Sequence, residues 1–303
     1  MRWGRSSAAR RSSSFSRHAM FRGRCEMARI VAGIGTSHVP SVGVAYDRGK
    51  MRDPEWKPLS DAFVPVRAWL QELKPDVAII VYNDHGADFF FDKYPTFAVG
   101  AAESYAIADE GFGVRPLPPL RGDADFSWHL CESLVYDEFD ITVCQEMALE
   151  HGFLVPMNLC FPHDPDWPVA VVPVQVNVVQ HPLPTAQRCY RLGQAIRRAV
   201  ESYGRDLRVA IAGTGGMSHQ LNGPRFGHMN EKFDLDFLDR LERDPDSLCR
   251  MTHQTLMEEA GAEAVELIMW LTMRGAMGSN SRRIHKNYYA PMTTGMGMIT
   301  FED

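Results

Sequence analysis

Three runs that are typical of buried strands each lead into a histidine. ARIVAGIGTSHVP leads to His38, DVAIIVYNDHG leads to Asp84 and His85, and RVAIAGTGGMSHQ leads to His219. Any one of these histidines alone is most simply a hydrogen-bonded structural residue, because a buried polar ring needs a partner. Ligands bind at the carboxyl ends of strands in α/β folds, so three equivalent histidines favour a shared site.

A carboxylate lies in an apolar segment near the C-terminus. In AEAVELIMWLTM, Glu266 follows Val and precedes Leu, Ile, Met and Trp. An ionised carboxylate in such a segment is costly unless it is paired or bound to a metal. An ion pair with Arg274 and a metal site are the two explanations, and the local pattern does not choose between them.

Two histidines and one carboxylate form a ligand set with known chemistry. They fit the facial triad that holds non-haem Fe(II) and leaves positions open for substrate and O2. The same set could hold a hydrolytic zinc ion, although the HExxH motif of the common zinc proteases is absent. The long spacing between the three residues is by itself a weak signal.

The elements that must position these residues alternate along the chain. Apolar runs predict strands at Ala28–Ile34, Asp76–Tyr82, Val169–Val179 and Leu207–Thr214, and a last one near Gly295–Phe301. Amphipathic patterns predict helices over Ser60–Leu73, Pro184–Tyr203, 231–243 and 254–274, with Pro65 expected to kink the first or to delay its start. This alternation predicts an α/β fold whose sheet is covered on both faces.

Composition limits the class of protein. The chain has 303 residues, of which 45% are hydrophobic and 23% charged, as in globular proteins. No run reaches the roughly 18 apolar residues of a membrane span. Six cysteines without CxxC spacing indicate reduced thiols of a cytoplasmic protein.

The N-terminal 26 residues differ from the rest. They carry seven Arg and one acid, a charge of +6, so the net charge of −6 leaves −12 for the remainder. A body that acidic argues against nucleic acid as a partner. We expect residues 1–26 to be a disordered or mis-annotated extension, despite a composition similar to a mitochondrial transit peptide, and residues 27–303 to be one catalytic domain.

A series of motifs runs in order through most of the body. They are TSHVP (36–40), VYNDH (81–85), PTFAVG (95–100), ADEGFGVRPLP (108–118), EHGFLVP (150–156), VNVVQ (176–180), AGTGGMSHQLNGPR (212–225), FDLDFLDRL (233–241) and VELIMWLTMRGAM (265–277). With them the sequence resembles the catalytic β subunits of protocatechuate 4,5-dioxygenases, in the class III extradiol ring-cleaving dioxygenase family. The resemblance implies a mixed β-sheet flanked by helices. It also implies an Fe(II) enzyme that inserts both atoms of O2 into a catecholic acid such as protocatechuate, giving a ring-opened semialdehyde.

The resemblance also implies residue roles. His38, His85 and Glu266 would bind the iron. His219 would be the acid–base residue beside the substrate, and His151 would hydrogen-bond a ring hydroxyl. The local pattern alone does not single out His151, which could equally be a buried structural histidine.

Substrate recognition is where the sequence departs from these relatives. They carry a Ser-Asn pair that binds the substrate carboxylate, whereas Thr293 and Thr294 occupy the corresponding positions here. Because a threonine hydroxyl is shorter than an amide, a dihydroxypyridine of the 3-hydroxy-4-pyridone type, gallate or another catecholic ring is an alternative substrate. Asp84, next to His85, is a candidate for orienting that ligand, and capping the following turn is its other explanation.

Two other functions and a partner complete the expectations. A zinc hydrolase could use the same three ligands, and a non-catalytic scaffold could use them to hold a structural metal. The family resemblance implies a separate small helical α subunit that caps the site; action alone as a homo-oligomer is the alternative.

Overall fold

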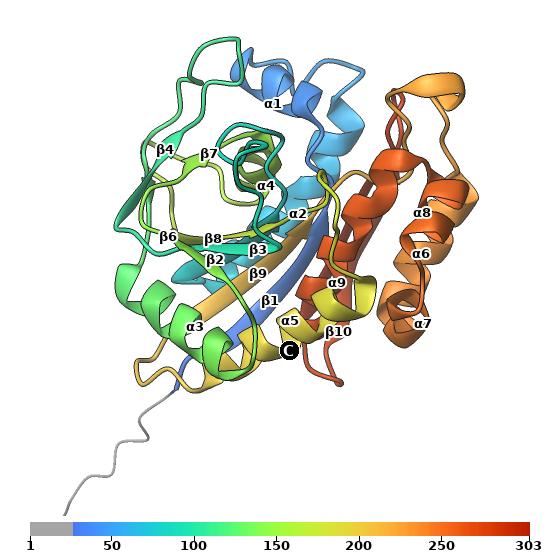
Figure 1. The fold of residues 1–303 in the computed structure, drawn as a ribbon. Helices are drawn as coiled ribbons and strands as arrows, with labels where there is room; N and C mark the ends of the chain where they lie inside the picture. Colours follow the sequence, from blue (N-terminus) through green and yellow to red (C-terminus); the bar gives the residue numbers. More distant parts are fainter. Residues whose placement is uncertain (1–26) are drawn as a thin grey trace, which may run out of the picture.

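The computed structural model describes residues 27–303. The expectations for residues 1–26 lie outside the described residues. An eight-stranded sheet forms the centre of the molecule (Figure 1). Its order is β10 (Arg282–Tyr289), β11 (Met296–Glu302), β1 (Arg29–Thr36), β9 (Arg208–Thr214), β2 (Val77–Tyr82), β8 (Ala170–Val176), β3 (Phe97–Gly100) and β6 (Thr142–Cys144).

The sheet is mixed, as the family resemblance implies. Strands β1, β9, β2 and β8 are parallel, whereas β11 pairs antiparallel with β1 and β3 pairs antiparallel with β8. A second, small sheet has the order β5 (Leu120–Arg121), β4 (Ser104–Ile107) and β7 (Ala148–Leu149). The four parallel strands therefore deliver their carboxyl ends to one edge, where His38, His85 and His219 follow β1, β2 and β9.

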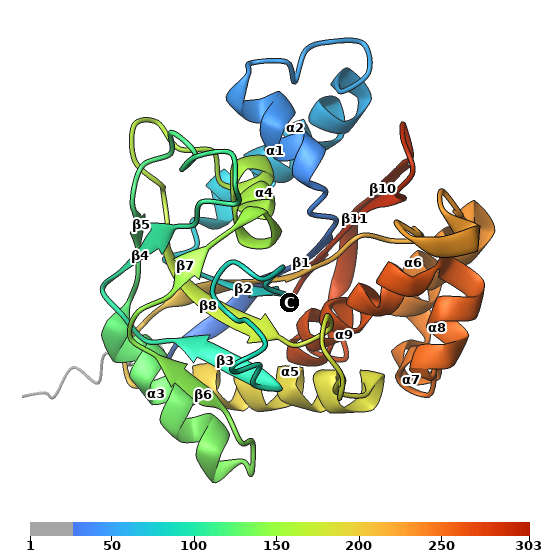
Figure 2. The same cartoon turned by 45° about the horizontal axis from the view of Figure 1, so that its top comes forward.

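Helices cover both faces of the sheet, and Figure 2 shows the layers. One face carries α3 (Ala124–Tyr136), α5 (Ala186–Glu201) and α9 (Leu267–Ala276), with α6 (Glu231–Arg243), α7 (Pro245–Cys249) and α8 (His253–Ala260) at its end. The other face carries α1 (Pro40–Asp47), α2 (Lys57–Leu73) and α4 (His151–Cys160). Strand β2 is apolar throughout because Val77, Ile79 and Val81 enter one core and the alternate residues enter the other.

Two predicted helices differ from the observed ones. Helix α2 begins at Lys57, earlier than expected, and contains Pro65. The helix predicted over 254–274 is broken: α8 ends at Ala260, a 3-10 turn spans Ala262–Glu266, and α9 follows. Gly261 makes the break with φ 101°, and a Cβ there would lie 2.0 Å from the carbonyl oxygen of His219. The break places Gly261 against the loop that follows β9 and contains His219.

The thiols of the described residues are free. Cys131, Cys160, Cys189 and Cys249 are buried, and Cys144 is partly buried. Burial raises the pKa of Cys160 and of Cys189 to about 12, so these thiols stay protonated and unreactive. Within residues 27–303, no helix is both long and apolar enough to cross a membrane.

Candidate metal centre and active site

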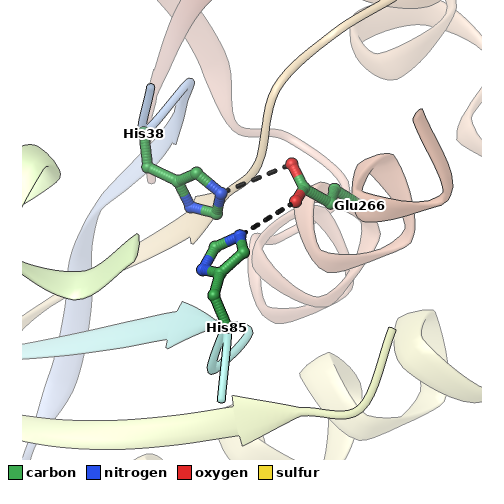
Figure 3. A group of neighbouring side chains, drawn as sticks. All are labelled: His38, His85 and Glu266. Atoms are coloured by element: carbon green, nitrogen blue, oxygen red, sulfur yellow. Dashed lines mark ion pairs between the residues drawn. The ribbon is translucent and has the colours of Figure 1, made fainter. Parts of the chain in front are cut away.

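His38, His85 and Glu266 meet at the carboxyl edge of the sheet, and Figure 3 shows both rings turned toward the carboxylate. Nε2 of His38 lies 3.3 Å from Oε2 of Glu266, and Nε2 of His85 lies 3.4 Å from Oε1. One ligand atom from each residue falls within 4.8 Å of the other two. Arg274 does not pair with Glu266, because its Nε donates to the carbonyl of Leu241. The three side chains are therefore placed to hold one metal ion.

Each of the three comes from a separate part of the fold. His38 lies in the loop after β1 and His85 in the loop after β2, where neighbouring loops converge at the sheet edge. Glu266 is the last residue of the 3-10 turn and the N-cap of α9. The backbone N–H of Gly216 donates to its Oε2 at 2.6 Å and holds the carboxylate.

The Nδ1 atoms of His38 and His85, the ring nitrogens that do not face Glu266, each have a hydrogen-bond partner of their own. Nδ1 of His38 lies 3.0 Å from the hydroxyl of Thr214, at the end of β9. Nδ1 of His85 lies 3.0 Å from Oε2 of Glu150, which is fully buried. A carboxylate can only accept when ionised, so Nδ1 of His85 carries a proton and Nε2 is left to face the centre. This is the arrangement by which proteins orient metal-binding imidazoles.

Burial and charge set the electrostatics of the centre. Burial favours the neutral acid at Glu266, but His38 and His85 outweigh it and hold the pKa of that carboxyl well below its usual range. Burial lowers the pKa of His38 despite the nearby carboxylate. The anionic Glu266 and the neutral His38 are in the ionisation state that a divalent cation needs. Although burial opposes it, Glu150 and Glu266 raise the pKa of His85 to about 10, so a metal would have to displace a proton from that ring.

Two observations show that the donor set fits a metal. Nε2 of His38 is buried and has no hydrogen-bond partner, which is costly unless another group uses its lone pair. The side chain of His85 is 30% exposed, so the centre opens to solvent on that side. Two imidazoles, one carboxylate and an open side suit a non-haem metal with free coordination positions.

His219 also reaches this edge of the sheet. Its Nδ1 donates to the carbonyl of Met217 at 2.8 Å, so Nε2 is the nitrogen left free. A Cβ at Gly216, whose N–H donates to Glu266, would lie 2.6 Å from Cε1 of His219, so the ring lies beside the triad without belonging to it. His219 forms an isolated β-bridge with Thr294, which is buried, whereas Thr293 is exposed. The predicted acid–base residue and one predicted substrate-binding residue are therefore neighbours.

His151 stacks on His85. The ring centroids lie 4.2 Å apart with an interplanar angle of 27°. Nδ1 of His151 contacts carboxylates of both Glu110 and Glu150, and these carboxylates raise the pKa of His151 although burial opposes them. His151 and Glu110 line a cavity of about 390 Å³ between α1 and the loop that contains Phe112.

Of the two explanations for Asp84, orienting His85 and capping the following turn, the structure supports the second. The Asp84 carboxylate accepts hydrogen bonds from backbone N–H groups of the following turn, including Gly86 and Phe89, so it caps that turn. The carboxylate on His85 is Glu150, which the sequence did not single out. Its only local signal is the position before His151, as the N-cap of α4.

Asn83 is a further residue that sequence reasoning missed. Its Nδ2 lies 3.0 Å from Nε2 of His85 and 3.4 Å from Oε1 of Glu266. A polar residue between a buried strand and His85 was a visible signal, but it does not reveal which ligands the amide contacts.

Comparison with known proteins identifies the family. The model of a family described as the catalytic LigB subunit of aromatic ring-opening dioxygenase matches residues 32–300. The chain belongs to this family. The match covers all three residues of the metal-binding triad and both neighbouring histidines.

Two relatives of this LigB family member are dioxygenases by name. A gallate dioxygenase of Pseudomonas putida is 48% identical over 197 residues, which cover 65% of this chain and 58% of the relative. A 2,3-dihydroxyphenylpropionate/2,3-dihydroxicinnamic acid 1,2-dioxygenase of Comamonas testosteroni is 24% identical, over 83% of this chain and 89% of its own. The match thus spans little more than half the length of the gallate dioxygenase.

A solved structure shares the fold. The crystal structure of an uncharacterized protein from Escherichia coli K12 superposes on this chain with a TM-score of 0.54 at 13% sequence identity. The superposition covers 89% of this chain and 99% of the Escherichia coli protein. At this identity the likeness concerns the fold alone. It supports the α/β architecture with a mixed central sheet.

Proposed function

We propose that this chain is a non-haem Fe(II)-dependent extradiol dioxygenase that opens a catecholic aromatic acid, with gallate as the preferred substrate. The observation that carries the proposal is the convergence of His38, His85 and Glu266 beside His219 at an open edge of the sheet. The chemistry that ferrous iron supplies when bound there is activation of O2 toward a chelated diol. Both oxygen atoms enter the product, so no further reductant is required.

The neighbouring side chains have defined tasks in this proposal. Nε2 of His219 accepts a proton from a diol hydroxyl and later returns it, because Nδ1 is already committed to Met217. His151 donates a hydrogen bond to a ring hydroxyl. Burial of His38, Glu266 and His219 keeps water from competing for these groups.

Gallate is preferred over protocatechuate for two reasons. The name of the Pseudomonas putida relative points to gallate, which was an alternative to the protocatechuate expected from motifs. The carboxylate of Glu110, 25% exposed beside His151, offers an acceptor for a third ring hydroxyl that protocatechuate lacks. Thr293 and Thr294 would donate their hydroxyls to the substrate carboxylate.

The test is O2 uptake after anaerobic loading of the full chain with Fe(II). Gallate, protocatechuate, catechol and 2,3- and 3,4-dihydroxypyridine are compared, with Zn(II)-loaded protein as the control. We expect the highest kcat/KM for gallate, with one O2 consumed for each ring opened. Cleavage of an added aryl ester by the zinc form, without O2 uptake, would indicate a zinc hydrolase. Stoichiometric metal without turnover of any diol would indicate a structural metal site.

The helical α subunit and the homo-oligomer both stay predictions. Sedimentation of the active protein separates them, because activity in a single-component species would exclude an obligatory second chain. The same measurement with gallate present shows whether substrate changes the assembly.

A further inference from the structure

A buried carboxylate that the proposed reaction does not use lies behind the His219 loop. Asp234, in the first turn of α6, is fully buried. Its Oδ1 accepts from the backbone N–H of Ser218 at 2.8 Å, and its Oδ2 accepts from the Ser218 hydroxyl at 2.6 Å. The hydroxyl of Tyr288, on β10, donates to the same Oδ2 at 2.9 Å. We refer to Asp234, Ser218 and Tyr288 as the Asp234 cluster.

The cluster joins three segments that are distant in sequence. Asp234 belongs to α6, Tyr288 to β10, and Ser218 to the loop after β9. Ser218 also accepts a hydrogen bond through its hydroxyl from the backbone N–H of Asn230, the N-cap of α6. An ionised carboxylate that receives three donors is strongly held, and its removal leaves those donors buried without a partner.

The segment that the cluster holds ends at His219. Met217 and Ser218, which precede His219, form backbone hydrogen bonds to Gly295. The N–H of Met217 donates to the carbonyl of Gly295, and the N–H of Gly295 donates to the carbonyl of Ser218. A Cβ at Gly295 would lie 2.4 Å from Oδ2 of Asp234, so the carboxylate packs directly against this backbone. Gly295 follows Thr294, the bridge partner of His219.

We infer that Asp234 is a positioning residue that fixes His219 and Thr294 relative to each other and to the triad. Its carboxylate forms hydrogen bonds to Ser218 and Tyr288 and packs against Gly295, so it acts on His219 through Ser218 and Gly295. A displacement of about 1 Å at a reacting group costs on the order of 10²-fold in rate, so such a support has a measurable effect. The inference rests on the proposed function for its kinetic part only.

The variants are Asp234→Asn and Tyr288→Phe, with Asp236→Asn as the matched control. Asp236 lies on the same helix, is exposed, and pairs with Arg240 at the surface. Tyr288→Phe removes one of the three hydrogen bonds and keeps the carboxylate, so it remains informative if Asp234→Asn folds poorly. His219→Ala sets the largest loss of turnover that mispositioning can produce.

The first measurement is amide hydrogen exchange on the metal-free full chain. We expect exchange at Met217, Ser218 and Gly295 to become at least about tenfold faster in Asp234→Asn, to change less in Tyr288→Phe, and to stay unchanged in Asp236→Asn. This result does not depend on the reaction. Unchanged exchange in both cluster variants would overturn the inference even if the dioxygenase activity is confirmed.

The second measurement is kinetic, with iron content determined on the same samples. We expect Asp234→Asn to keep wild-type iron and to lose about 10- to 100-fold in kcat, while KM changes by less than about threefold. A parallel loss of iron, melting temperature and turnover would show a purely structural role and overturn the inference. An inactive wild type with altered exchange in the variants would instead contradict the proposed function and leave the positioning role standing.

Discussion

Two cavities lie at opposite edges of the central sheet and have very different linings. The larger, of about 710 Å³, lies at the amino ends of β2, β8 and β9 and is bordered by Lys74, Arg121 and Arg205. The smaller, of about 390 Å³, lies beside the triad and is lined by His151 and Glu110. Within residues 27–303, two groups of side chains are suited to a metal, the triad and the group of His85, Glu150 and His151. Both include His85, at the carboxyl edge. Convergent ligand atoms, and not volume, distinguish the site.

The physical reason lies in the topology of the parallel strands. At the carboxyl edge, the loops after β1, β2 and β9 converge and bring polar residues together. At the amino edge, charged side chains such as Lys74 and Arg121 remain exposed to solvent. Solvated charges of this kind contribute little binding energy individually.

The largest contrast between the two edges concerns metal binding. We expect His38→Ala, His85→Ala and Glu266→Ala each to abolish stoichiometric iron binding and O2 uptake, since each removes one of three ligands. Arg121→Ala, at the opposite edge, should leave both unchanged. The measurement is iron content after anaerobic reconstitution and desalting. Near-stoichiometric iron in any triad variant would remove that residue from the ligand set.

A variant of Glu150 tests how far the hydrogen-bond partner of a metal ligand contributes to metal binding and activity. In Glu150→Gln the side chain keeps its size but loses the charge that fixes the protonated Nδ1 of His85 and contacts His151. We expect iron affinity or kcat/KM to fall about 10- to 100-fold, the usual range for such partners. Glu146→Gln, a solvent-exposed carboxylate nearby in sequence, is the control. Equal iron affinity and activity in both variants would limit Glu150 to capping α4.

The smallest expected effect concerns the substrate carboxylate. The double variant Thr293→Ser, Thr294→Asn restores the pair found in protocatechuate-cleaving relatives. A hydrogen bond to a charged group contributes about 1.5–3 kcal/mol, so the ratio of kcat/KM for protocatechuate over catechol should rise at least about tenfold. Both proteins are measured at equal iron loading. An unchanged ratio would show that the carboxylate is bound elsewhere.

The main elements were predictable because their patterns are local. Apolar runs located the four parallel strands, and helical spacing located α5 and α6 within two residues of their observed bounds. The short strands β3 to β7, the strand β10 and the helices α1, α4 and α7 were not predicted. The break at Gly261 was also missed, because it depends on the close approach of the His219 carbonyl from another part of the chain.

The sequence by itself identified the triad candidates, since a histidine after a buried strand and a carboxylate in an apolar segment are costly without a purpose. The ordered motifs identified the family as well. Only the tertiary structure decided which residues form hydrogen bonds to the triad candidates. Thr214 lies 176 positions from His38, and Glu150 lies 65 positions from His85. Partners so distant leave no local pattern, because a hydrogen bond depends on where the folded backbone places its two atoms.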